Sequence, residues 1–238
     1  MGKHGKHRAL VGALAAGLVL AGPAAADCRL ALVLAVDISS SVDAEEDRLQ
    51  RQGLARALTS ERVRRAALAL PGQHVALAVF EWSGRWQQET LLEWTPLRSA
   101  ADIDAAAAAI AGSTRSYADF PTAAGYALGY ASEMLGRAPD CLFRTIDISG
   151  DGVSNEGFPP SFAYSNFPLG DVTVNGLAIT GHDETVVRFY RTQIVRGPGA
   201  FLEIADDFPD FERAMTRKLE REMGARVVGS SGDGPRVQ

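Results

Sequence analysis

The sequence is poor in the side chains that hold transition metals. Only four histidines and two cysteines occur among 238 residues, and only His74 and His182 lie beyond the first 26 positions. Neither histidine has a partner at the spacing of a zinc site. The chain also has no G-x-S-x-G nucleophile elbow, no phosphate-binding P-loop and no H-E-x-x-H helix. These absences weigh against zinc enzymes, α/β-hydrolases and P-loop nucleotide hydrolases.

No apolar run is long enough to cross a bilayer as a helix. The run at residues 9–21 is about 13 residues long, whereas a spanning helix needs roughly 20. It follows a basic start at residues 3–8 and precedes three alanines at residues 24–26, which offer an A-x-A cleavage site. This order is typical of a secretory signal peptide. We expect residues 1–26 to be removed and the mature protein to be periplasmic or secreted; an uncleaved membrane anchor is the alternative.

The mature chain also lacks an excess of positive charge. Removing residues 1–26 removes three basic side chains and no acidic one, so 21 basic and 29 acidic side chains remain, a net charge of −8. An acidic surface disfavours nucleic acid and anionic membranes as partners. We therefore expect no nucleic-acid partner and no stable membrane insertion after signal cleavage.

Short apolar runs alternate with helical patterns along the rest of the chain. Strands are expected at residues 29–37, 74–80, 85–95, 141–149, 171–180 and 201–205, and helices at residues 43–70, 101–111, 121–135, 184–194 and 210–223. The alternation predicts a three-layer, doubly wound α/β fold with a mostly parallel sheet and one antiparallel edge strand. We expect one domain over residues 27–226, in which residues 157–170 form a loop. Residues 227–238 are expected to be a disordered tail.

Three oxygen-bearing residues follow the first expected strand. Asp37, Ser39 and Ser41 are spaced at two, so a turn can bring their side chains together. Open α/β sheets bind ligands at this carboxyl end of their strands. The D-x-S-x-S pattern by itself more often serves turns and helix caps. Two further residues extend it, because Asp151 ends another buried strand and Thr122 precedes a helix.

Together these segments resemble the von Willebrand factor A-type family, in particular a bacterial exported branch. Its metal-ion-dependent adhesion site combines D-x-S-x-S, a loop threonine and a D-G pair after the fourth strand. Residues 37–41 match the first motif, Thr122 with Ala127 and Leu128 the second, and Asp151-Gly152 the third. The resemblance covers about residues 28–225. The chain departs from the family pattern in having Phe120-Pro121 before the threonine and G-D-G in place of T-D-G.

The resemblance implies a divalent-cation site that binds Mg²⁺, with Mn²⁺ or Ca²⁺ as alternatives. Its ligands would be Asp37, Ser39, Ser41, Thr122 and Asp151. All five offer oxygen, which hard cations prefer. Where one carboxylate binds through a water molecule, the ion would stay under-neutralised and keep a position open to an acidic group of a protein partner.

The function expected from this resemblance is a non-enzymatic, metal-dependent interaction module of the adhesion type. One alternative is a scaffold of the same fold that binds no metal. Another is a magnesium-dependent hydrolase. A haloacid-dehalogenase-type phosphotransferase would need a second aspartate where this chain has Ser39.

The two cysteines add a test of strand order. Cys28 lies nine residues before Asp37, and Cys141 lies ten residues before Asp151. The family places these two strands side by side and parallel, so both cysteines would lie at the end of the sheet opposite the ion. Neighbouring strands are about 4.8 Å apart, which suits a disulfide. The resemblance thus implies a Cys28–Cys141 bridge; two buried free thiols are the alternative.

Other polar and aromatic residues near the expected site are expected to support its ligands or to contact a partner. Asp147 shares its strand face with Ser149 and Asp151, so it is expected to bond either a ligand hydroxyl or a neighbouring loop. A rim for a partner is expected on the same side of the sheet; packing within the loops is the alternative for these residues. The rim comprises Trp82, Arg85, Trp86, Asn155, Glu156 and Phe158, with Tyr164 and Phe167 as further members.

Overall fold

The computed structural model describes residues 1–2, 27–181 and 183–224. The predicted signal peptide from residue 3 onward and the predicted tail lie outside these ranges. Within them, no helix is both long and apolar enough to cross a membrane.

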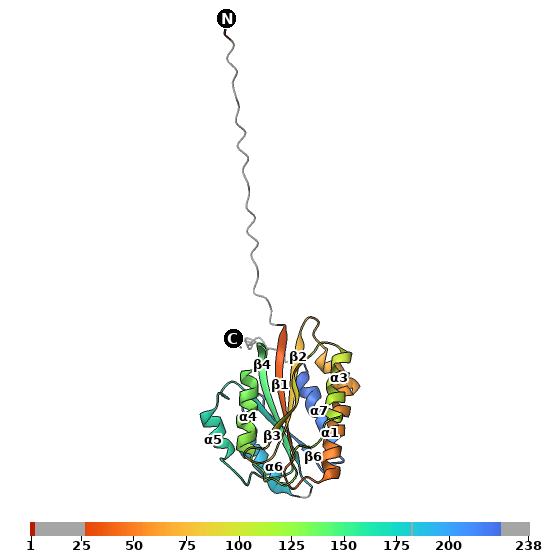
Figure 1. Ribbon diagram of the computed structural model, residues 1–238, viewed down its shortest axis with the longest axis vertical. Coiled ribbons are helices and arrows are strands. Elements are labelled where there is room, and N and C mark those ends of the chain that lie inside the picture. The colour runs from red at the N-terminus through yellow and green to blue at the C-terminus, as the bar shows by residue number, and fades with distance from the viewer. Residues whose placement is uncertain (3–26, 182, 225–238) are drawn as a thin grey trace, which may run out of the picture.

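A six-stranded sheet forms the centre of the domain, in the order β3-β2-β1-β4-β5-β6 (Figure 1). The strands are β1 (Cys28–Asp37), β2 (His74–Trp82), β3 (Gln88–Leu97), β4 (Cys141–Gly150), β5 (Thr173–Ile179) and β6 (Leu202–Ala205). All neighbours pair in parallel except β2 and β3, which form an antiparallel hairpin. The predicted doubly wound fold with one antiparallel edge strand is confirmed.

Helices cover both faces of this sheet (Figure 1). The helices are α1 (Ala44–Thr59), α2 (Glu61–Ala67), α3 (Ala100–Ala111), α4 (Ala124–Gly136), α5 (Pro160–Asn166), α6 (Glu184–Phe189) and α7 (Phe211–Met223). Leu32 and Leu34 of β1 pack into a core with α1, α3 and α7, whereas Ala31 and Val33 pack into a second core with α4. Because both faces are covered, side chains on both faces of β1 are buried, and its residues 30–36 are all apolar.

Local sequence explains where the first helices begin and end. Asp43 caps α1 by accepting from the backbone of Glu45 and Glu46, and the Glu46 carboxylate accepts from the Asp43 N–H. This is the capping box that the sequence predicts. The expected helix of residues 43–70 is broken at Ser60, whose hydroxyl caps α2.

Three element predictions were wrong in detail. Helix α4 begins at Ala124, so Pro121 lies in the preceding loop and not in the first helical turn. The expected loop of residues 157–170 contains α5, which Pro160 starts because its missing N–H needs no helical partner. The helix after residue 184 changes to a π-helical turn at Tyr190–Ile194, which carries Tyr190 into the core.

The disulfide is confirmed, and the alternative of two free thiols is wrong. Cys28 and Cys141 are register partners on β1 and β4, and their Cα atoms lie 4.6 Å apart. Their bond closes the end of the sheet opposite the D-x-S-x-S turn. The positions of the two cysteines relative to Asp37 and Asp151 therefore agree with the pairing of β1 and β4.

Candidate metal site

The predicted ligands meet where β1 and β4 end. The Ser39 N–H donates to Asp37 Oδ1 at 2.7 Å, which folds the turn back on the strand. The hydroxyls of Ser39 and Ser41 lie 3.3 Å apart, and Ser41 Oγ donates to Asp151 Oδ1 at 2.8 Å. Four oxygen-bearing side chains from two strand ends thus form one cluster.

Asp37 is the most deeply buried member of this cluster. Its side chain is fully buried, and its Oδ2 has no hydrogen-bond partner among the described residues. Burial, and next the charge of Asp151, raise the pKa of Asp37 to about 7. Burial also raises the pKa of Asp151. A buried carboxylate oxygen without a donor is costly, and a cation at this point would remove the cost.

The backbone at Gly150 leaves room for this carboxylate. A β-carbon at Gly150 would lie only 2.6 Å from Asp37 Oδ2 and 2.7 Å from the Tyr190 hydroxyl. Any larger residue would therefore displace one of these groups. Gly150 stands where the family pattern has threonine, so this departure keeps space beside Asp37.

Thr122 follows Phe120-Pro121 in the loop before α4 and lies near the turn after β4. A β-carbon on Gly152 would lie 3.7 Å from Thr122 Oγ1, so the hydroxyl is next to the turn that carries Asp151. The Ser40 N–H donates to the Phe120 carbonyl at 2.8 Å, and the Thr122 N–H donates to Asn155 Oδ1 at 2.9 Å. These bonds fix the loop on both sides of Thr122.

The donor set consists of oxygen atoms, the ligands that hard cations prefer. Within residues 27–181 and 183–224, no group of three or more His, Cys, Asp or Glu side chains is arranged to hold a metal ion. Any cation here would depend on hydroxyls and water in addition to Asp37 and Asp151. Magnesium commonly keeps several waters and takes one or two carboxylates.

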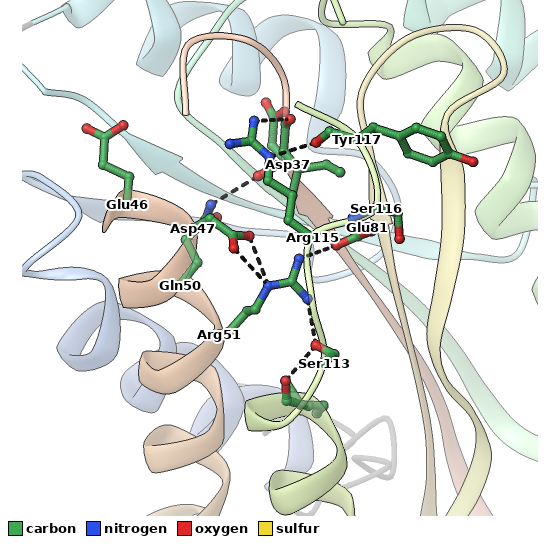
Figure 2. Close-up of polar contacts among 12 residues, drawn as sticks. Asp37, Glu46, Asp47, Gln50, Arg51, Glu81, Ser113, Arg115, Ser116 and Tyr117 are labelled. Carbon is green, nitrogen blue, oxygen red and sulfur yellow. Dashed lines mark hydrogen bonds and ion pairs between the residues drawn. The ribbon is translucent and has the colours of Figure 1, made fainter. Parts of the chain in front are cut away.

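Arg115 supports the turn and was not anticipated from the sequence. Its Nη2 donates to the carbonyls of Ile38 at 2.8 Å and Ser39 at 3.1 Å, and its Nε donates to Tyr117 at 2.7 Å. From the opposite side, Gln50 Nε2 donates to the Asp37 carbonyl at 3.0 Å (Figure 2). Arg115 binds backbone atoms only, so nothing in its local sequence signals this role.

A second arginine fixes α1 beneath the turn. Arg51 contacts Asp47 at 3.0 Å, pairs with the fully buried Glu81 at the end of β2, and donates to Ser113 at 2.6 Å (Figure 2). Glu81 Oε1 also accepts from the Ser116 N–H at 2.7 Å. The available signal was Glu81 itself, an acidic residue directly after a continuous apolar strand.

Asp147 has a different role from the one predicted. It contacts Lys218 Nζ of α7 at 2.9 Å, and both side chains are buried. The predicted bond to a ligand hydroxyl or a neighbouring loop is therefore wrong. The strand face was correctly assigned, but α7 covers this part of it.

The predicted rim is partly wrong, because Trp82 is only 1% exposed and packs in the core with α4. Trp86, by contrast, is 78% exposed. It contacts Tyr126 edge-on at 6.0 Å between ring centroids, and Tyr126 stacks on Phe158 at 4.1 Å. We refer to Trp86, Tyr126 and Phe158 as the aromatic strip.

The other rim residues lie around the aromatic strip or below it. Arg85 pairs with Glu156 at 3.5 Å. Asn155 is exposed and bonded to Thr122, whereas Tyr164 and Phe167 are partly buried, and the Tyr164 hydroxyl donates to the Ile194 carbonyl. For Tyr164 and Phe167, the alternative of packing within this region therefore holds in place of a rim role.

The fold is that of von Willebrand factor A-type domains. A von Willebrand factor type A structure from Catenulispora acidiphila superposes with a TM-score of 0.61 at 17% identity, over 84% of this chain and 44% of that one. Proximal thread matrix protein 1 from the mussel byssus, with a zinc-occupied MIDAS motif, gives 0.59 at 18% identity, over 82% and 46%. The pilus adhesin SpaC from Lactobacillus rhamnosus GG gives 0.57 at 16% identity, over 82% and 30%.

The chain spans less than half the length of each of these structures. A family model described as "Protein of unknown function (DUF1194)" matches residues 27–236, and the chain belongs to this family. No curated protein sequence matches the chain significantly.

Proposed function

We propose that the protein is an exported, divalent-metal-dependent interaction module of the adhesion type. The buried, unpartnered Asp37 Oδ2 beside Ser39, Ser41 and Asp151 carries this proposal. A Mg²⁺ ion held by these residues and Thr122 would neutralise two carboxylates that otherwise repel each other. Mn²⁺ and Ca²⁺ are alternative ions, since both also prefer oxygen ligands.

The partner proposed for this module is a protein that presents a carboxylate. Two protein carboxylates formally equal the charge of a divalent ion. The hydroxyls and waters that complete its coordination shell bind more weakly, so a carboxylate of the partner can displace them. The aromatic strip lies beside the loop that bears Thr122, because Tyr126 is on α4 and Phe158 follows the Asp151 turn. Trp86 is the exposed end of this strip and the candidate anchor for an apolar side chain of the same partner.

Export to the periplasm or the cell exterior is consistent with the disulfide and the basic-apolar start of the sequence. A hydrolase is the less favoured function, because the described cluster contains no histidine to act as a base for the hydroxyls of Ser39 and Ser41. Two of the similar structures are a thread matrix protein and a pilus adhesin. Their likeness supports an interaction role for the fold without extending their partners to this chain.

A pull-down from the exported fraction tests the proposal. Tagged residues 27–238 serve as bait with magnesium or with a chelator, and Asp151→Asn and Trp86→Ala serve as variants. We expect a protein captured only with magnesium, lost with Asp151→Asn and weakened with Trp86→Ala. Capture that is equal with magnesium and with chelator would show that the domain acts as a metal-free scaffold.

A further inference from the structure

Lys218 lies between two carboxylates where α7 packs against the sheet. Its Nζ is 2.9 Å from Asp147 Oδ1 and 2.7 Å from Glu222 Oε1. Lys218 is 0% exposed, Asp147 1% and Glu222 2%. Phe201 covers the amine, with its ring centroid 4.9 Å from Nζ. An amine, a carboxyl group and a second carboxylate are thus held together away from water.

Lys218 is an exception in the sequence. From residue 27 onward it is the sole lysine. All remaining residues of the Lys and Arg group in this range are arginines. Arginine would serve a buried ion pair better, because its charge is permanent and its fork binds two oxygens. Lysine differs in that its amine can lose a proton and then act as a nucleophile. The single lysine stands at the one place where an amine faces a buried carboxyl group.

Ion pairing leaves this cluster incompletely satisfied. One cation faces two carboxylates, so the fully ionised cluster carries a buried negative charge, which desolvation makes unfavourable. Both Asp147 oxygens and Glu222 Oε2 lack a hydrogen bond of good geometry among the described residues, and Asn175 Nδ2 donates to Glu222 Oε1 at 2.6 Å. Burial and then the charge of Glu222 raise the pKa of Asp147 to about 8, although Lys218 opposes this. The raised pKa favours the carboxylic acid form of Asp147.

We propose that Lys218 and Asp147 condense to an intramolecular isopeptide bond, with Glu222 transferring the proton. A proton first passes from the Lys218 ammonium to the Asp147 carboxylate, which gives a neutral amine and a neutral acid. The Nζ lone pair then attacks Asp147 Cγ, and the C–OH bond of Asp147 breaks. Glu222 takes a proton from Nζ and delivers it to the departing hydroxyl. The products are one amide and one water, and Glu222 returns to its starting state.

The bond would tie the closing helix to the centre of the sheet. The disulfide joins β1 to the start of β4, and the isopeptide bond joins β4 to α7. It also replaces two buried opposite charges by an amide. The reacting groups lie far apart in the sequence, so the bond forms only after β4 and α7 have packed. This proposal stands whether or not the domain binds a metal.

Mass spectrometry of the purified exported protein, reduced and denatured, tests the bond directly. We expect a mass one water below that of the reduced mature sequence. Trypsin should release residues 145–188 joined to residues 218–221, because it does not cleave after an acylated lysine. A full, undiminished mass with cleavage after Lys218 would overturn the proposal. So would a water loss confined to residues 145–188, since a cyclised Asp151-Gly152 pair gives the same mass change.

Two variants separate the roles of the residues. Lys218→Arg keeps the charge and Glu222→Gln keeps the size, and both should have the full mass without cross-linked peptide. An amine-reactive label applied to the denatured wild-type protein should modify only the terminal amine, but should modify two amines in Glu222→Gln. A complete cross-link in Glu222→Gln would overturn the proton-transfer role. Reaction of Lys218 in the denatured wild-type protein would overturn the bond itself.

Discussion

Ser41 donates a hydrogen bond to Asp151 at 2.8 Å, and this contact joins the turn after β1 to the turn after β4. The two residues come from the first and third motifs of the predicted site. Their contact exists because β1 and β4 are parallel neighbours whose carboxyl ends coincide.

Removing Asp37 should abolish stabilisation by metal. Magnesium at a hundredfold excess over its dissociation constant should stabilise the wild-type protein by about 2.7 kcal/mol, or roughly 5–10 °C in melting temperature. Asp37→Asn should show no such shift in a thermal melt. Ser40→Ala is the matched control, because the exposed Ser40 lies in the same turn and uses only its backbone there. Equal shifts in both variants would contradict the site.

The stability of the metal-free protein should fall as pH rises from about 4 to about 7. The folded pKa of Asp37 is raised from 3.8 to about 7, so the folded state binds this proton more tightly than the unfolded state does. The contribution of Asp37 to the free energy of unfolding is complete at pH values below its pKa in the unfolded state. This contribution is lost as pH rises to its pKa in the folded state. The full change is of the order of 4 kcal/mol.

Chemical denaturation in chelator at several pH values measures this effect. Other groups titrate in the same range, so the difference between wild type and Asp37→Asn isolates Asp37. That difference should change with pH over this window, and its dependence on pH should weaken when magnesium is added. A pH-independent difference would rule out the raised pKa.

Breaking the disulfide should destabilise the domain by about 4–5 kcal/mol on the chain-entropy model, because the bond closes a long loop. The cysteines are 113 residues apart in sequence. Urea denaturation of wild type with and without reductant measures the loss. A Cys28→Ala/Cys141→Ala double variant should already show it and should not respond to reductant. A response of the double variant would mean that the reductant acts elsewhere.

Glu81→Gln should destabilise the domain by about 3–5 kcal/mol, because it leaves the charge of Arg51 buried with less compensation. Glu81 is fully buried and holds both Arg51 and the Ser116 N–H. The exposed pair of Arg65 and Glu61 provides the control, since Glu61→Gln should cost less than about 1 kcal/mol. The denaturant midpoints of the two variants, each relative to wild type, measure the two losses of stability. Similar losses in the two variants would show that burial of the Arg51–Glu81 pair adds nothing to the free energy of unfolding.

The sequence by itself determined the fold and the outline of the site. β1 and β2 contain continuous apolar runs because both faces of these strands are buried, and this local signal predicts them from the sequence. Turn residues after β1 and β4 then placed Asp37 and Asp151 at one edge. The family resemblance implied the pairing of β1 with β4. The cysteine offsets agreed with this pairing, because residues at equal depth in parallel neighbours are close in space.

Only the tertiary structure decided what each polar or aromatic residue faces. Trp82 and Trp86 are close in sequence, yet one is in the core and the other is exposed. Asp147 faces α7, and Arg115 binds the backbone of a turn distant in sequence. The period of a strand assigns a residue to a face, but the helix that covers this face is fixed by packing of the whole chain. The same packing buries the single lysine of the mature sequence between two carboxylates.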